Sequence, residues 1–238
     1  MLILFDIDGT LLRTQRAGVR AVGDAGRELF GTEFKEDLID YAGGLDPVLF
    51  RNVLKAHGLP YETAHIDQLR AAYRRHLERR LNDSPVAIAL PGVPELLDAL
   101  TPHEHITLGL LTGNFPETGA LKLTAAGIDV ERFDVRVWGC DSPHEEAIRE
   151  HLPPVAVDRY HDLHGVRLDY ARVTIIGDTI HDVRCAKAHG CRALAVATGG
   201  HDRAQLDASD ADLVVEDLSH TQGLLEWLMN PRPTVPTT

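Results

Sequence analysis

The hydrophobic pattern divides most of the chain into short apolar runs that alternate with helical segments. Short runs of apolar residues suit strands buried on both faces of a parallel sheet, and they occupy residues 2–5, 106–111, 133–138, 173–176, 193–197 and 213–215. Segments with apolar positions at helical spacing follow, over 93–100, 116–126, 147–161, 183–189 and 218–229. This alternation predicts an α/β fold with a doubly wound parallel sheet.

The segment 13–89 interrupts the alternation. Its apolar positions recur at helical spacing and predict two helices, around 48–54 and 66–77, while no strand pattern in it is convincing. Between the first strand and these helices, the sequence Gly43-Gly44-Leu45-Asp46-Pro47 predicts a turn with Asp46 as N-cap and Pro47 at the first helical position. A segment of this length is not a loop. We therefore expect an inserted α-helical domain over 13–89, an α/β core formed by 1–12 and 90–230, and a disordered tail over 231–238.

Composition and charge narrow the class of partner. The 238 residues include 44% hydrophobic residues, enough for a core, and carry a formal net charge of −12. An acidic surface argues against nucleic acid or an anionic membrane as the main partner. Three cysteines are too few for a disulfide framework, and no apolar run approaches the length of a membrane span. We expect a cytoplasmic protein that does not bind nucleic acid or membrane, either a monomer or a homodimer.

Two carboxylates stand where the first strand ends. Asp6 and Asp8 lie two residues apart, so they point the same way if the strand geometry persists. Gly9 then permits a sharp turn and a close approach of the main chain to a ligand. Two neighbouring acids repel each other unless a cation or a shared proton intervenes. A purely structural turn or a calcium loop is the competing interpretation.

Polar residues also follow two later strands, and the carboxyl ends of parallel strands form the binding edge of an open α/β sheet. Thr112-Gly113-Asn114 offers a hydroxyl and backbone N–H groups before a helix, a combination that binds anions such as phosphate. Thr112 or Asn114 as a simple helix N-cap is the alternative. Gly177-Asp178 follows another buried strand, with Asp182 four residues after Asp178. Asp178 is placed to complete a metal site with Asp6, and hard cations such as Mg²⁺ prefer such oxygen ligands.

These three segments resemble, in order, the first, second and fourth motifs of the haloacid dehalogenase-like (HAD) superfamily, including Asp-x-Asp-Gly-Thr and Gly-Asp-x-x-x-Asp. The resemblance, to the phosphoglycolate phosphatase-like subgroup, implies a Rossmann-like core and a helical cap over 13–89. It implies Asp6 as nucleophile and metal ligand, and Asp8 as acid/base with its carbonyl as a ligand. Phosphate would bind at Thr112, Gly113 and Asn114. Mg²⁺ would be bound by Asp6, Asp8 and Asp178, with Asp182 as a further ligand or as a group that orients the ligands.

The third motif departs from the common pattern, because the family needs a cation beside the nucleophile and no Lys-Pro precedes the fourth motif. Lys122 lies on the helix after Thr112-Gly113-Asn114, as in one subgroup, and Arg149 lies near the usual place. We favour Lys122, although the rise of a helix puts its Cα roughly 12 Å along the axis from Asn114. It reaches the site only if that helix folds back beside the first strand.

The resemblance implies a magnesium-dependent phosphatase that hydrolyses a small phosphorylated metabolite through an aspartyl-phosphate. A haloacid dehalogenase shares the fold, but that branch lacks the second aspartate, which Asp8 supplies here. A sugar-phosphate mutase shares both aspartates and more often has valine where Thr10 stands. A non-catalytic binding protein on the same fold is the remaining alternative. The sequence does not name the substrate.

Overall fold

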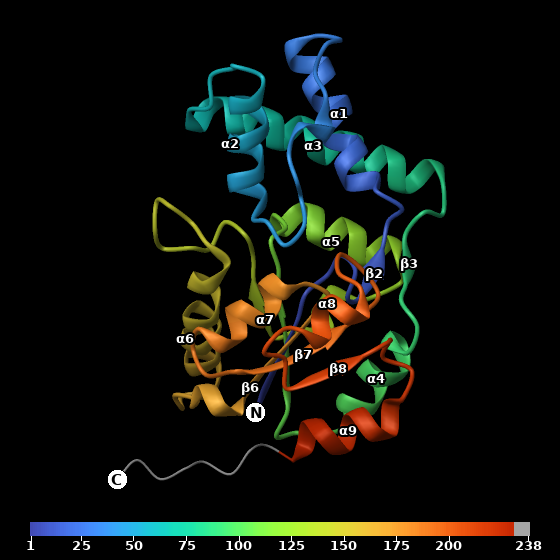
Figure 1. Ribbon diagram of the computed structural model, residues 1–238, viewed down its shortest axis with the longest axis vertical. Coiled ribbons are helices and arrows are strands. Elements are labelled where there is room, and N and C mark those ends of the chain that lie inside the picture. The colour runs from blue at the N-terminus through green and yellow to red at the C-terminus, as the bar shows by residue number, and fades with distance from the viewer. Residues whose placement is uncertain (231–238) are drawn as a thin grey trace.

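The computed structural model describes residues 1–230, so the tail predicted over 231–238 lies outside the described residues. Six strands form one sheet in the order β5-β4-β1-β6-β7-β8, and every neighbouring pair is parallel (Figure 1). The strands are β1 (Leu2–Phe5), β4 (Thr107–Leu111), β5 (Val135–Val137), β6 (Val173–Gly177), β7 (Arg192–Val196) and β8 (Leu213–Val215). The α/β fold with a doubly wound parallel sheet, predicted from the alternation of apolar runs, is confirmed.

Helices cover both faces of the sheet because side chains alternate along each strand. In β1, Leu2 and Leu4 belong to the apolar cluster that includes α6 (Leu152–His164) and α7 (Ile180–Lys187). Ile3 and Phe5 point to the opposite face and pack with α4 (Val93–Leu100) and α9 (Thr221–Met229). The short α8 (Arg203–Asp207) lies against β7 and β8. Strands β4 and β5 lie on one side of β1, and strands β6, β7 and β8 lie on the other. The direction of the strand order therefore reverses beside β1, and the carboxyl end of β1 lies at this topological switch point.

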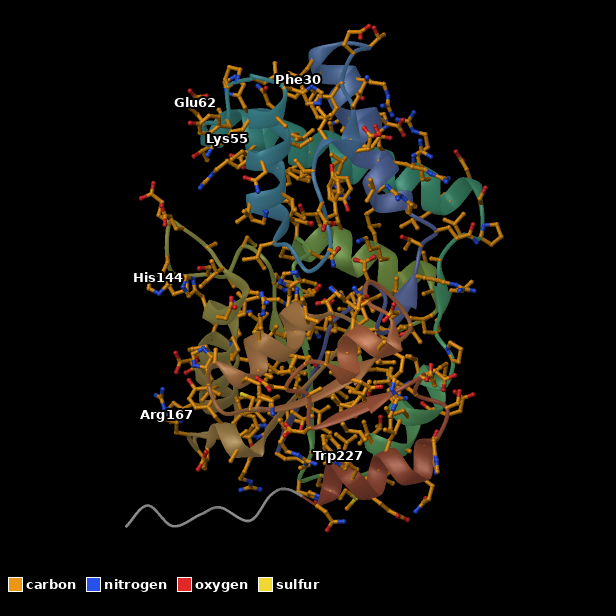
Figure 2. All side chains as sticks on the ribbon, viewed as in Figure 1. Phe30, Lys55, Glu62, His144, Arg167 and Trp227 are labelled. Carbon is orange, nitrogen blue, oxygen red and sulfur yellow. The ribbon has the colours of Figure 1, made fainter. Side chains whose placement is uncertain are left out.

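Three helices form a separate layer over the carboxyl ends of the strands (Figure 1). They are α1 (Ala17–Phe30), α2 (Asp46–Ala56) and α3 (Thr63–Asp83), and they bury an apolar cluster of their own. Phe30, Lys55 and Glu62 lie at the end of this layer that is remote from the sheet (Figure 2). The predicted helices correspond to α2 and α3, whereas α1 was not among them. Within residues 1–230, no helix combines the length and apolar character that a membrane span requires.

Two short strands connect this layer to the sheet. β2 (Leu12–Arg13) pairs antiparallel with β3 (Ile88–Ala89), where the chain leaves the sheet and where it returns. The expectation of no strand in the segment 13–89 is therefore wrong, because strands of two residues are too short to produce an alternating pattern. Short 3₁₀ helices at Glu36–Leu38, Val130–Arg132, Arg149–His151 and Tyr170–Arg172 complete the elements together with α5 (Pro116–Ala125).

The first residues of α6 and α2 show how the local sequence affects where a helix begins. α6 begins at Leu152, so Pro153 and Pro154 fall in its first turn, where a missing N–H leaves no helical hydrogen bond unmade. α2 begins at Asp46 with Leu45 as its N-cap, so the prediction of Asp46 as N-cap is wrong by one residue. The Asp46 carboxylate instead accepts a hydrogen bond from the backbone N–H of Phe115, at 2.9 Å. The Asp46 side chain therefore stabilises the start of α5 rather than the start of α2.

Candidate active site

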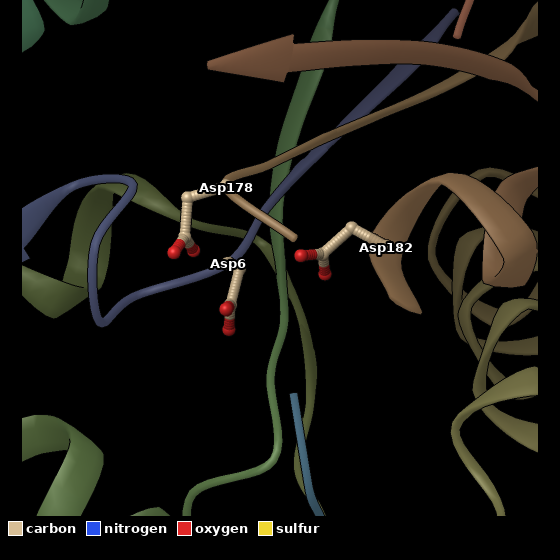
Figure 3. Close-up of side chains that lie close together, drawn as sticks. All are labelled: Asp6, Asp178 and Asp182. Atoms are coloured by element: carbon tan, nitrogen blue, oxygen red, sulfur yellow. The ribbon is translucent and has the colours of Figure 1, made fainter. Parts of the chain in front are cut away.

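The carboxyl ends of β1 and β6 bring three aspartates together. Asp6 directly follows β1, Asp178 directly follows β6, and Asp182 lies in the first turn of α7 (Figure 3). One carboxylate oxygen from each lies within 4.8 Å of the other two, and all three residues are buried. The sequence-based expectation that Asp6 and Asp178 meet at one edge of the sheet therefore agrees with the geometry.

The crowding of buried acids changes their protonation. Burial raises the pKa of Asp6 from 3.8 to about 6, against the opposing effect of the Arg149 guanidinium. Burial, and after it the charges of Asp182 and Asp6, raise the pKa of Asp178 to about 8. Each shift means that the ionised carboxylate is disfavoured in the folded protein. A cation placed among these oxygens would relieve both costs.

Asp182 has its oxygens engaged by protein groups. One oxygen accepts hydrogen bonds from the backbone N–H of Thr179, at 3.0 Å, and from the Thr179 hydroxyl, at 2.6 Å. The other lies 2.6 Å from Nη2 of Arg149. The reciprocal bonds with Thr179 form a capping box at the start of α7. Asp182 thus fixes the helix start and holds Arg149, which favours the orienting role among the two that the sequence left open.

Asp178 is held by groups that the sequence analysis did not assign to the site. The Thr10 hydroxyl donates to one carboxylate oxygen at 3.2 Å, and the backbone N–H of Gly200 donates to the other at 2.5 Å. Gly9 lies directly against the same carboxylate, where a Cβ would approach to 2.4 Å of an oxygen, and its φ is 78°. Only glycine fits both demands. Thr10 had a detectable signal, since it is the last residue of the Asp-x-Asp-Gly-Thr motif.

Asp8 is joined to α5 rather than to the other aspartates. Its Oδ2 accepts hydrogen bonds from Nζ of Lys122, at 2.5 Å, and from the side-chain amide of Asn114, at 2.9 Å. Lys122 also donates to the Asn114 side-chain oxygen at 2.6 Å. Burial opposes the charge of Lys122, but Asp8, Tyr73 and Asp46 outweigh it and raise the pKa of Lys122. The amine is therefore buried beside Asp8, and its charged form is favoured.

Both candidates for the third-motif cation reach the site. α5 lies between the sheet and the helical layer (Figure 1), so the Lys122 side chain points to the end of β1 despite its position far along the helix. Arg149, in the 3₁₀ helix before α6, is buried and lies 3.2 Å from an oxygen of Asp6. From the sequence, Lys122 and Arg149 were alternatives for one role, the cation of the third motif. The structure instead places Lys122 at Asp8, and Arg149 between Asp6 and Asp182.

Residues 112–114, which directly follow β4 and are called the Thr112 segment below, line the same site. The Thr112 hydroxyl accepts from the Asn114 side-chain amide at 2.9 Å, and it forms a hydrogen bond to Asp6 that lowers the pKa of that carboxyl. Neither Thr112 nor Asn114 is the helix N-cap, because α5 begins at Pro116 with Phe115 as its N-cap. The competing interpretation of these residues as simple caps is therefore wrong. Gly113 accepts from the backbone N–H of Asp46 at 2.7 Å, which joins this segment to the helical layer.

These groups face a cavity of about 390 Å³ between the sheet and the helical layer. Its lining includes all the predicted site residues except Asp182, and it adds residues from 13–89 such as Arg16, Tyr41, Asp46 and Tyr73. A cavity of this size accommodates a small metabolite. Gly43, Gly44 and Asp46, which belong to the turn predicted at 43–47, also line the cavity.

Comparisons with known proteins place the chain among its relatives. A profile of the haloacid dehalogenase-like hydrolase family matches residues 3–196. The chain is 30% identical over 233 residues to the "Probable phosphatase IndB" of Dickeya dadantii, covering 96% of this chain and 94% of that protein. It is 28% identical to a phosphoglycolate phosphatase of Vibrio parahaemolyticus, over 92% of each chain.

A solved structure shows the same fold. A hydrolase from Pseudomonas syringae superposes with a TM-score of 0.71 at 23% identity, and the superposition covers 95% of this chain and 97% of that one. The family profile spans most of the first strand, the helical layer and the sheet as far as β7, and thus the aspartates, the residues after β4, Lys122 and Arg149 of the site described above. The chain therefore belongs to the haloacid dehalogenase-like hydrolase family, as its three sequence motifs indicated.

Proposed function

We propose that the protein is a magnesium-dependent phosphatase that hydrolyses a small phosphorylated metabolite through an aspartyl-phosphate on Asp6. The observation that carries the proposal is the position of the Asp6 carboxylate, buried at the end of β1 within one cavity with the Thr112 segment and with Asp8. The relatives named as phosphatases support the same reaction class.

The donor set fits a hard divalent cation. Asp6 and Asp178 offer carboxylate oxygens close together, and Asp178 is kept in place by Thr10 and Gly200. Within residues 1–230, the acidic cluster includes no histidine or cysteine, which favours Mg²⁺ over softer metals. Asp6, Asp178 and the Asp8 carbonyl would bind the ion, and Asp182 would orient the site through Arg149. Bound Mg²⁺ would offset negative charge on the transferring phosphoryl group.

The side chains of the site carry out the nucleophilic attack, the proton transfers and the binding of phosphate. Asp6 attacks phosphorus in line, so that a bond forms between its carboxylate oxygen and phosphorus while the bond to the leaving oxygen breaks. Asp8 donates a proton to the leaving oxygen and later takes one from the water that releases phosphate. Lys122 holds Asp8 toward the cavity, and the Thr112 segment binds phosphate oxygens. Lys122 fills the role of the third motif in this assignment, and Arg149 keeps Asp6 ionised.

The helices α1, α2 and α3 act as a cap over the site in this proposal, with the residues 1–12 and 90–230 as the catalytic core. Their separate apolar cluster and the two short strands at the junction support the division. A cap that closes over the cavity would exclude water while Asp6 is attacked and would then release the product.

The rival functions receive less support. A dehalogenase has no use for an acid/base at Asp8, yet two side chains, Lys122 and Asn114, hold that carboxylate in place. A non-catalytic binding protein would have no need to keep three buried acids at a free-energy cost. A sugar-phosphate mutase shares these groups, and it differs in returning the phosphate to sugar instead of water.

Release of phosphate from p-nitrophenyl phosphate tests the proposal. The wild type should be active with Mg²⁺, inactive with EDTA and inactive as Asp6→Asn with Mg²⁺. The control is Asp67→Asn, which alters an exposed acid on α3 outside the cavity lining and should retain activity. Activity of Asp6→Asn equal to that of the wild type would refute the proposal. Conversion of a sugar phosphate to its isomer without net phosphate release would establish the mutase instead.

A further inference from the structure

The turn that leads into α1 keeps two non-glycine residues in the left-handed region. The Thr14 carbonyl accepts a hydrogen bond from the Ala17 N–H at 2.9 Å, and between them Gln15 has a φ of 48° and Arg16 a φ of 64°. Positive φ at both central positions is the pattern of a type I′ turn, where glycine, asparagine and aspartate dominate. Long side chains there cost free energy, and such cost is typically kept at functional sites.

Both turn residues line the catalytic cavity. Among the described residues, four cationic side chains line it, and two of them form ion pairs, Lys122 with Asp8 and Arg149 with Asp6. The other two, Arg13 and Arg16, take part in no side-chain ion pair or hydrogen bond within the described residues 1–230. An acid-rich cavity is thus lined by two guanidinium groups that form no ion pair with a described carboxylate.

Tyr41, another residue of the cavity lining, carries a hydrogen-bond donor without a partner among the described residues. This donor is its hydroxyl, which is buried. Arg16 lies near enough to oppose the rise in the pKa of Tyr41 that burial and the nearby acids cause. A buried hydroxyl without a partner is costly, and most such groups in proteins are satisfied. A ligand atom that accepts a hydrogen bond would remove this cost.

We propose that Arg16 and Tyr41 form a second oxyanion-binding subsite at the cap end of the catalytic cavity. The substrate is then a phosphate monoester whose leaving group carries another oxyanion, either a carboxylate or a second phosphate. This inference rests on the proposed phosphatase function, since Asp6 and the Thr112 segment take the reacting phosphate. Oxyanions only accept hydrogen bonds, and a guanidinium and a phenol hydroxyl both donate, so the pair matches that chemistry.

The test compares matched substrates that differ only at the second group. These are 2-phosphoglycolate with a carboxylate, ethylene glycol bisphosphate with a phosphate, and 2-hydroxyethyl phosphate with a neutral hydroxyl. The measured quantity is the ratio of kcat/KM for each charged substrate to kcat/KM for the neutral one. We expect the wild-type ratio to be well above one for at least one oxyanion. The charged substrate that gives it identifies whether the subsite takes a carboxylate or a phosphate.

Variants then assign the preference to residues. Arg16→Gln and Tyr41→Phe should each lower that ratio by about tenfold, the effect of one charge-assisted hydrogen bond, and Arg16→Lys should restore part of it. Arg20→Gln, one helical turn along α1 and outside the cavity lining, should leave the ratio unchanged. Arg16→Gly should unfold at the same temperature as the wild type or higher, because glycine adopts positive φ without strain.

Several results would overturn the subsite. These are a wild-type ratio near one for both charged substrates, a ratio that Arg16→Gln and Tyr41→Phe leave unchanged, or a loss confined to Arg13→Gln. A melting temperature lowered by several degrees in Arg16→Gly would show that the side chain serves the fold instead. In all these cases hydrolysis of 2-hydroxyethyl phosphate or p-nitrophenyl phosphate would still support the phosphatase. An absence of hydrolysis with every substrate would refute the proposed function itself.

Discussion

Asp46, the first residue of α2, accepts a hydrogen bond at 2.9 Å from the backbone N–H of Phe115, the residue before α5. The backbone N–H of Asp46 in turn donates to the carbonyl of Gly113 at 2.7 Å. Phe115 itself packs against Phe50 of α2, with ring centroids 5.4 Å apart. The helical layer is thus joined to the segment that follows β4, and there is no room for a side chain at Gly113, where a Cβ would lie 1.9 Å from the Gly44 carbonyl oxygen.

Removal of the Asp46 carboxylate should weaken the contact between α2 and the segment that leads into α5. We expect Asp46→Ala to speed amide hydrogen exchange at Phe115 and to raise KM for the substrate, because the Thr112 segment would lose the contact that positions it. Loss of one such charge-assisted bond costs about 1.5–3 kcal/mol. Asp46→Asn keeps an oxygen acceptor and serves as the control. Unchanged exchange at Phe115 in Asp46→Ala would show that the two elements are held together by other contacts.

Lys122 and Arg149 should differ in what their removal costs. Lys122→Met is expected to lower kcat by at least tenfold with a small loss of stability, because solvent reaches the Asp8 side chain, which is 42% exposed. Arg149→Met leaves Asp6 and Asp182 without a cation in a buried site and should lower the free energy of unfolding by about 3–5 kcal/mol. Urea unfolding and phosphatase assays on both variants measure the two effects. Equal stability losses would contradict the division of roles.

The raised pKa of Asp178 predicts how stability without metal depends on pH. The folded protein holds the proton of Asp178 up to a pKa of about 8, whereas the ordinary value is 3.8. The stabilisation from this proton is complete below the ordinary value and is lost as the pH rises to about 8. In EDTA, Asp178→Asn should therefore melt above the wild type at pH 8.5, with a smaller difference at pH 5. A difference of 1 kcal/mol corresponds to roughly 2–4 °C. A melting temperature of Asp178→Asn below that of the wild type at pH 8.5 would contradict the account.

The sheet was predictable from the sequence because each strand buried on both faces leaves a continuous apolar run, as in Leu2–Phe5. The helix α1 was not, since Gly18, Gly23 and Gly26 interrupt its helical pattern and lower its intrinsic propensity. β2 and β3 contain two residues each and leave no periodic signal. Local patterns thus reveal long regular elements, and elements that depend on contacts with distant residues escape them.

The site was predictable in its residues but not in its connections. The spacing of Asp6, Asp8 and Asp178 after strands placed them at one edge of the sheet. Helix rise alone could not tell whether Lys122 reaches that edge, because the answer depends on how α5 lies across it. The unpartnered hydroxyl of Tyr41 has no sequence signature, since burial and the absence of a partner exist only in the folded chain.

The central claim is that Asp6 becomes phosphorylated and that Asp8 moves the protons. Asp8→Asn keeps the attack geometry but removes proton transfer, which should slow turnover by roughly 10²–10⁴-fold. A substrate with a good leaving group, such as acetyl phosphate, should still phosphorylate this variant, because its departure needs no proton. The most direct test is therefore the amount of ³²P that remains covalently bound to acid-quenched protein after incubation with labelled acetyl phosphate and Mg²⁺. The account predicts label on Asp6 in Asp8→Asn and none in Asp6→Asn. Equal labelling of the two variants would contradict it.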